Sequence, residues 1–186
     1  MIIKQRAIEQ IEQFVTKVPE AAKGFTRRSD GLDNMVEIPA AGEGVGASVS
    51  IVDFDRYSVA FNQLDVYVSD QQVAAEERDD YLRRVAADIC QRLTYLEEPL
   101  ELLEFNRVDA VAQLRSNPPD RYPTETIYWE VAVRTSPSPR AKLTRYRWNA
   151  GNGQRVPVAY PATFATVGRL IEDLAQSVAD VIGVGR

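Results

Sequence analysis

The chain has 186 residues, of which 22 are lysine or arginine, 27 are aspartate or glutamate and one is cysteine, and 45% are hydrophobic. This composition is typical of a soluble globular protein, and we expect a single domain over residues 1–186. Histidine is absent, which excludes Ser/His/Asp and Cys/His catalytic systems and the usual zinc and haem ligand sets.

Catalysis without histidine would depend on carboxylates, lysine, tyrosine or a carboxylate-bound hard metal such as Mg²⁺. Cys90 is the lone cysteine and has no partner for an intramolecular disulfide. The sequence contains neither a signal-peptide pattern nor a run of about 18 apolar residues that would predict a membrane span. We therefore expect a cytoplasmic protein that needs no cofactor.

The N-terminal segment predicts a helix that Pro19 ends, because the residue before a proline is pushed out of helical geometry. Apolar side chains recur in it at intervals of three and four: Ile8, Ile11, Phe14, Val15 and Val18. A polar connection follows over residues 20–34.

Between residues 35 and 68 apolar and polar side chains alternate, which predicts antiparallel strands with one exposed face. The alternation changes phase between Phe61 and Leu64, so we expect a β-bulge at Asn62–Gln63. Residues 53–56 predict a tight hairpin turn. Residues 42–47 match the G-x-G-x-x-[GA] dinucleotide motif, but a strand follows where that motif requires a helix, which favours a hairpin loop.

A second helix is predicted behind Ser69, because Ser69 and Gln72 have the spacing of a capping box. Its apolar stripe comprises Leu82, Val85, Ala86, Ile89, Leu93 and Leu96. Further strands are expected at residues 100–105, 108–114, 126–134, 142–148 and 156–160. Pro161 is expected to open a third helix that ends at Gly183. Gly168 lies on its apolar face, where we expect a neighbouring element to approach closely.

These elements follow the order α-βββ-α-ββββ-α, with an N-terminal, a central and a C-terminal helix. Strands and helices do not alternate regularly. The order therefore predicts an α+β fold with a mainly antiparallel sheet of about six or seven strands.

Two acidic groups are candidates for a metal site. Asp53 and Asp55 are two residues apart, a spacing that can hold a hard cation but is also common in turns, which is the favoured interpretation. The acidic side chains of residues 97–104 (Glu97, Glu98, Glu101 and Glu104) are expected to be solvated charges on an edge strand. No catalytic residue and no metal ligand is assigned.

The charge is distributed unevenly along the chain. Residues 131–171 contain seven basic residues and no acidic one, so this stretch carries +7, whereas the rest, with 15 basic and 27 acidic residues, carries −12. We therefore expect a basic hairpin over residues 131–155 to engage an anionic ligand or an acidic protein partner. Its candidate binding residues are Arg134, Arg140, Lys142, Arg145, Arg147 and Arg155.

Nucleic acid is the less favoured partner, because a sheet that binds single strands places aromatic rings and cations on one face. Here Thr144, Tyr146 and Trp148 share a face with Lys142, whereas Arg145 and Arg147 point to the other side. Tyr146 and Trp148 are therefore expected in the core or in an interface. Alternatively, the arginines pair with acids of the same fold, such as Glu130 or the stretch 97–104.

The leading hypothesis is a non-enzymatic binding or adaptor protein. One alternative is a carboxylate- or Mg-dependent enzyme that acts on an anionic small substrate and uses the arginines as a clamp. Another is a structural subunit or homo-oligomer, since the order of elements is similar to that of small acidic secretion chaperones.

Overall fold

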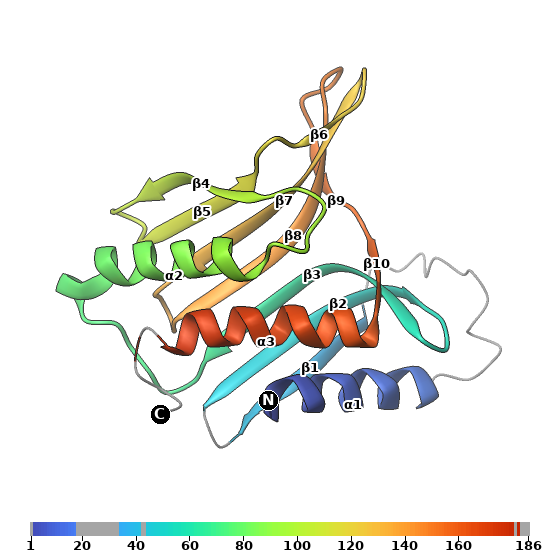
Figure 1. The fold of residues 1–186 in the computed structure, drawn as a ribbon, viewed down its shortest axis with the longest axis horizontal. Helices are drawn as coiled ribbons and strands as arrows, with labels where there is room; N and C mark the ends of the chain where they lie inside the picture. The colour runs from blue at the N-terminus through green and yellow to red at the C-terminus, as the bar shows by residue number, and fades with distance from the viewer. Residues whose placement is uncertain (1, 18–33, 42–43, 181, 183–186) are drawn as a thin grey trace.

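A computed structural model describes residues 2–17, 34–41, 44–180 and 182, and within them three helices lie on one face of an antiparallel sheet (Figure 1). The helices are α1 (Ile2–Lys17), α2 (Arg78–Arg92) and α3 (Phe164–Asp180), and the short 3-10 helix η2 (Ala75–Glu77) precedes α2. None of these described helices is long and apolar enough to cross a bilayer.

The main strands pair in the order β1-β2-β3-β8-β7-β5-β4. They are β1 (Asn34–Ala41), β2 (Val45–Phe54), β3 (Ser58–Val68), β4 (Leu100–Asn106), β5 (Val111–Ser116), β7 (Glu125–Arg134) and β8 (Arg140–Asn149). Three short strands extend the sheet: β6 (Asp120–Arg121) pairs with β7, β9 (Arg155–Pro157) with β8, and β10 (Tyr160–Thr163) with β3. The predicted α+β class and element order are confirmed.

Strand alternation gives the sheet one apolar face, which the helices cover. One row of directly paired, buried residues crosses six strands: Val36, Val49, Leu64, Leu143, Val131 and Leu114. Each such side chain stabilises the fold by about 1.5–3 kcal/mol through removal from water. The residues between them point to the opposite face, which no described helix covers and which is called the open face below.

Two local predictions are confirmed. In the pairing of β2 with β3, Ser50 is opposite Gln63 and Ile51 opposite Phe61, so Asn62 is the extra residue of a bulge. A Cβ atom on Gly168 would lie only 2.9 Å from Cγ1 of Ile8, so α1 and α3 approach closely at this glycine.

Two predicted helix starts are wrong. The Ser69 hydroxyl donates a hydrogen bond to the Gly44 carbonyl (3.0 Å) instead of capping a helix, and α2 begins only at Arg78. Pro161 lies in β10, and α3 begins after Thr163, whose Oγ1 accepts a hydrogen bond from the backbone N–H of Thr166 (3.2 Å). That geometry is the usual N-cap arrangement.

Other predicted features differ in smaller ways. Val108, expected in a strand, is 95% exposed before β5 begins. Three predicted helix-end positions lie outside the described residues: Val18, Pro19 and Gly183.

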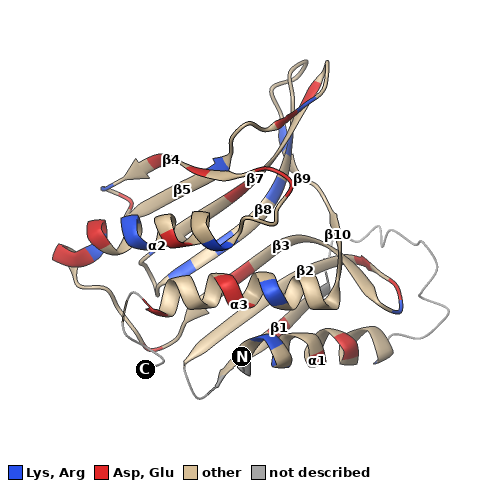
Figure 2. Cartoon of the chain, viewed as in Figure 1, with Lys and Arg blue, Asp and Glu red and all other residues tan. Residues whose placement is uncertain are grey.

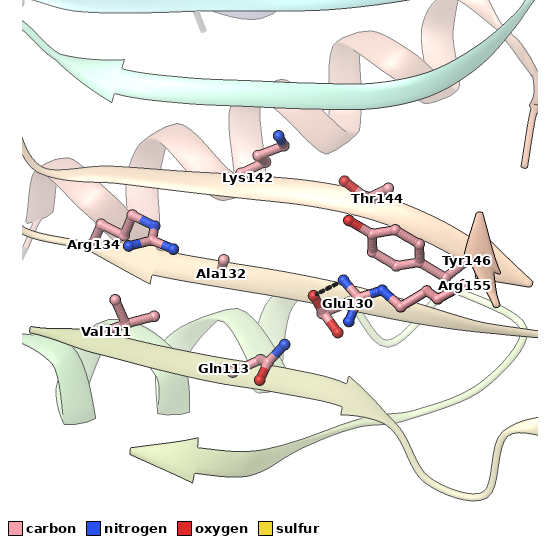
Figure 3. Close-up of a pocket in the computed structure, with 9 residues that line it drawn as sticks. All are labelled: Val111, Gln113, Glu130, Ala132, Arg134, Lys142, Thr144, Tyr146 and Arg155. Atoms are coloured by element: carbon pink, nitrogen blue, oxygen red, sulfur yellow. Dashed lines mark hydrogen bonds and ion pairs between the residues drawn. The ribbon is translucent and has the colours of Figure 1, made fainter. Parts of the chain in front are cut away.

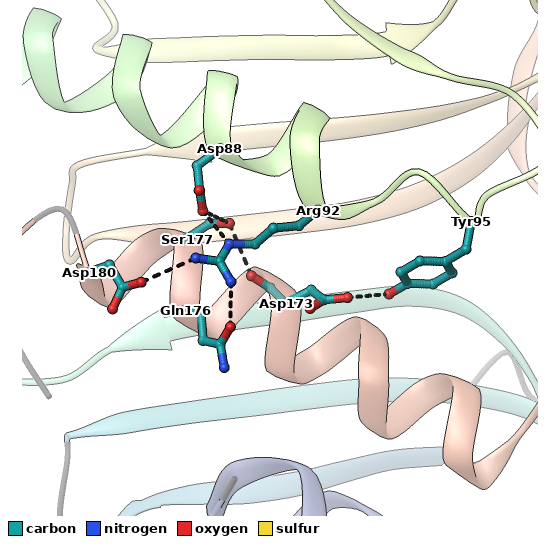
Figure 4. A network of polar contacts seen from close by, with 7 residues as sticks. All are labelled: Asp88, Arg92, Tyr95, Asp173, Gln176, Ser177 and Asp180. Atoms are coloured by element: carbon teal, nitrogen blue, oxygen red, sulfur yellow. Dashed lines mark hydrogen bonds and ion pairs between the residues drawn. The ribbon is translucent and has the colours of Figure 1, made fainter.

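A polar network joins α2 to α3 (Figure 4). Arg92 donates hydrogen bonds to Asp88 of its own helix (2.5 Å) and to Gln176 and Asp180 of α3. Ser177 Oγ in turn donates to the same Asp88 carboxylate (2.7 Å). These hydrogen bonds fix the position of α2 relative to α3 on the sheet.

Candidate functional site

The six predicted basic residues lie on β7, β8 and β9 and divide between the two faces of the sheet. Figure 2 marks the basic and acidic positions along the chain in blue and red. Arg140 and Lys142 of β8 lie on the open face, and Arg134 of β7 is directly opposite Arg140. Arg155 of β9 is on the same face. Alternation places Arg145 and Arg147 on the other side of β8.

Arg145 lies over the aromatic part of the core. Its guanidinium is 5.2 Å from the ring centroid of Trp129 and 5.3 Å from that of Tyr160, and its side chain is only 14% exposed. It donates hydrogen bonds to Glu97 (3.2 Å) and Glu98 (3.5 Å). Arg145 is therefore paired with acids of its own fold and packed against two aromatic rings.

The two carboxyls beside Arg145 respond differently to their surroundings. Burial raises the pKa of Glu98, and the nearby charge of Glu97 adds to that effect against the opposing charge of Arg145. Burial also acts on Glu97, but hydrogen bonds, led by that from the Tyr160 hydroxyl (2.7 Å), outweigh it and lower its pKa. The charge of Arg145 therefore favours the ionised form of Glu98 against the effect of burial on its pKa.

Arg147 forms an ion pair with Glu125 (3.4 Å), and Arg155 donates a hydrogen bond to Glu130 (2.7 Å). Pairing with Glu130 or with the stretch 97–104, one of the sequence-based alternatives, is therefore present for Arg155 and Arg145. These pairs leave Arg134, Arg140 and Lys142 to be considered as binding groups.

A pocket of about 370 Å³ lies on the open face over β5, β7, β8 and β9 (Figure 3). Its lining residues are Val111, Gln113, Glu130, Ala132, Arg134, Lys142, Thr144, Tyr146 and Arg155. With three cations and one carboxylate, the lining carries a net charge of +2. Three of the six predicted binding residues thus meet at one pocket.

The pocket exists because a small side chain interrupts a row of longer ones. Lys142, Ala132 and Gln113 are directly paired on β8, β7 and β5. Directly paired residues of adjacent strands point to the same face. The methyl group of Ala132 therefore forms the floor between two long polar side chains.

The cations of the pocket differ in their partners. Glu130 accepts hydrogen bonds from both Arg155 (2.7 Å) and Arg115 (3.1 Å), so its charge is already compensated. By contrast, Arg134 and Lys142 form no ion pair with any residue that the structure describes. These two cations are available to an anion that enters the pocket.

Arg140 extends the basic surface beside the pocket. It forms an ion pair with Asp65 (3.5 Å), whose pKa is raised by burial although Arg140 and Lys142 act to lower it. Asp65 Oδ1 and Arg140 Nε are buried without a hydrogen-bond partner among the described residues. Buried polar atoms normally have a partner, so water or a ligand is expected to complete these contacts.

Of the two placements expected for Tyr146 and Trp148, the core is wrong for Trp148 and for the pocket-lining Tyr146, and an interface stays a prediction. Tyr146 lines the pocket, and Trp148 is 39% exposed. The Arg155 guanidinium lies 3.6 Å from the Tyr146 ring centroid and therefore covers one face of that ring. With one face covered, the Tyr146 ring is poorly placed to stack on a nucleotide base. That nucleic acid is the less favoured partner stays a prediction.

The acidic candidates serve local structure. The hydrogen bond from the Ser58 hydroxyl (2.6 Å) lowers the pKa of Asp55. Hydrogen bonds from the backbone N–H groups of Tyr57 (2.7 Å) and Ser58 (2.8 Å) lower it further. Asp53 accepts one from the N–H of Phe54 (2.8 Å). Over the described ranges, no group of three or more acidic or cysteine side chains could hold a metal ion.

Charge counting along the chain missed part of the pocket, namely Ala132, Gln113 and Glu130. The sequence of β7 does indicate these pocket residues. Glu130, Ala132 and Arg134 alternate with apolar residues and therefore share the face opposite the core. That Ala132 lies directly opposite Lys142 depends on the register of β7 against β8, which could not be read from the sequence.

Comparisons with protein-family models, with curated proteins and with solved structures found no match to this chain. Function is therefore inferred from the pocket itself.

Proposed function

We propose that the protein is a non-enzymatic binding module that receives the anionic group of a ligand or acidic partner on its open face. Arg134 and Lys142 would contact the anion directly. Arg140 and Arg155, held by Asp65 and Glu130, would support the positive potential around it.

A single observation carries this proposal. Arg134 and Lys142 border the same pocket, and neither forms an ion pair within the described part of the chain. Asp65, which is directly opposite Lys142 on β3, is paired with Arg140. The other four predicted residues each form an ion pair with an acid of this fold.

The like charges on the open face also favour an anion there. Arg134 and Arg140 are directly opposite each other on adjacent strands, an arrangement that is destabilising when nothing lies between the charges. An anion bridging Arg134 and Lys142 would relieve this repulsion. Each hydrogen bond to a charged group contributes about 1.5–3 kcal/mol, so two would contribute about 3–6 kcal/mol against the entropic cost of association.

The test replaces both cations at once. In Arg134→Gln/Lys142→Gln, binding of a fluorescent decaglutamate peptide or of citrate should weaken at least tenfold, measured by anisotropy and calorimetry at low salt. The matched control is Arg78→Gln/Arg84→Gln, which removes the same charge from exposed positions on α2, away from the pocket. Its affinity should stay within twofold of the wild type.

Equal weakening in both double variants would show that net charge alone attracts the anion, and the proposal would then fail. It would also fail if neither probe bound the wild-type protein.

A second candidate, the homo-oligomer, is favoured by the edge strand β4. Leu102 and Leu103 of this strand are 43% and 54% exposed, and β4 has no partner on its outer side in the described residues. Exposed apolar edges tend to pair with another chain. Sedimentation should then show an oligomer that Leu103→Lys dissociates, whereas a monomer at high concentration would exclude this candidate.

A further inference from the structure

A second hollow of about 280 Å³ adjoins the pocket on the open face. Its lining residues are Glu104, Asn106, Asp109, Val111, Gln113 and Arg134, and the last three also line the first pocket. The two hollows therefore lie side by side over the strands from β8 to β4, and together they are called the groove below.

Strand register fixes what lies along this groove. Lys142, Ala132, Gln113 and Glu104 are directly paired in succession on β8, β7, β5 and β4. Adjacent strands are about 4.8 Å apart, so Ala132 is roughly 10 Å from Glu104 across the groove. The distance of roughly 10 Å between Ala132 and Glu104 sets the length of ligand that the groove can hold.

The two ends of the groove carry opposite charge. Lys142 lies at the first pocket, and Arg134 borders both hollows. At the other end Glu104 is exposed and has no hydrogen-bond or ion-pair partner among the described residues, and Asp109, which is held by the Asn106 amide (2.7 Å), adds a second carboxylate.

Gln113 lies between the charged ends. Its side-chain amide makes no hydrogen bond within the described residues, so both its donor and its acceptor face the groove unused. An amide in this position matches a ligand that has peptide-like groups between its charged ends.

We propose that the groove binds a free zwitterionic ligand of tripeptide length, with its carboxylate between Arg134 and Lys142 and its ammonium group at Glu104. The proposal rests on the proposed function and names its ligand class. An extended tripeptide spans roughly 10 Å, which matches the separation of the two ends, whereas a single amino acid is too short. Glu104 and Asp109 favour an ammonium group over a second carboxylate at this end of the groove.

Triglycine and two blocked forms of it separate the contributions of the charged ends. N-acetyl-triglycine keeps the carboxylate without the ammonium group, and triglycinamide keeps the ammonium group without the carboxylate. Calorimetric or NMR titration of the wild-type protein should show triglycine binding at least fivefold more tightly than N-acetyl-triglycine. Triglycinamide and glycine should bind more weakly than both.

The Glu104→Gln variant tests the ammonium contact directly. It should bring the affinities for triglycine and N-acetyl-triglycine to within twofold of each other. The matched control Glu76→Gln removes an exposed carboxylate on η2 and should keep the wild-type ratio.

The outcomes separate this inference from the proposed function. If N-acetyl-triglycine binds as tightly as triglycine, or if Glu104→Gln keeps the fivefold preference, the zwitterion inference is overturned while anion binding stands. If no carboxylate ligand binds, or if binding survives Arg134→Gln/Lys142→Gln, both are overturned.

Discussion

Arg145, one of the predicted binding residues, lies against the core, so we expect it to contribute to stability, and Arg145→Met tests this expectation. The substitution keeps an apolar stem over Trp129 but removes the charge that pairs with Glu97 and Glu98. The Glu98 side chain is only 11% exposed, so its carboxylate would be left buried without a cation. Removing one partner of a buried ion pair costs about 3–5 kcal/mol, and partial exposure of Glu97 places the expected loss near 3 kcal/mol.

Urea unfolding followed by tryptophan fluorescence measures this loss, which should also lower the thermal midpoint by about 6–12 °C. The matched control Arg147→Met removes a half-exposed arginine from the same strand and should cost about 0.5 kcal/mol or less. Adding Glu98→Gln to Arg145→Met should restore part of the stability, because it removes the uncompensated charge. If Arg145→Met is as stable as Arg147→Met, the assignment of Arg145 to the core is wrong.

Three further predictions concern packing, helix contact and pH. Gly168→Val should cost about 1–3 kcal/mol in urea unfolding because its side chain would collide with Ile8, and an unchanged midpoint would contradict the close approach of α1 and α3. Arg92→Ala should cost about 1–2 kcal/mol by removing the hydrogen bonds to Gln176 and Asp180, and a thermal midpoint equal to the wild type would show that the network is dispensable. Burial raises the pKa of Asp65, so the folded state holds its proton more tightly than the unfolded chain does. The wild type should therefore lose stability relative to Asp65→Asn as pH rises from about 4 through the folded pKa, and a pH-independent difference would contradict this.

The fold was predictable from the sequence where a local residue pattern reflects a contact with another element. The phase change at Asn62 predicted a bulge, and Gly168 on an apolar helix face predicted close packing; both are confirmed. The two predicted helix starts are wrong because Ser69 and Pro161 contact segments that are distant in the sequence. Ser69 is bound to Gly44, 25 residues away, and Pro161 pairs with β3.

The site was predictable only in part, because charge counted along a strand combines its two faces. Arg145 and Lys142 are three residues apart, yet one is held against the core and the other lines a pocket. Alternation alone separates them. Which arginine is neutralised depends on Glu97 and Glu130, whose positions follow from the pairing of distant segments.

Residue-resolved NMR titration with N-acetyl-triglycine tests the central claim most directly, because it reports which face of the sheet receives an anion. The largest saturable shifts are expected at the backbone amides of Ala132, Arg134 and Lys142, and they should disappear in Arg134→Gln/Lys142→Gln. Largest shifts at Glu97 and Arg145 instead, or the absence of any saturable shift, would contradict anion binding on the open face.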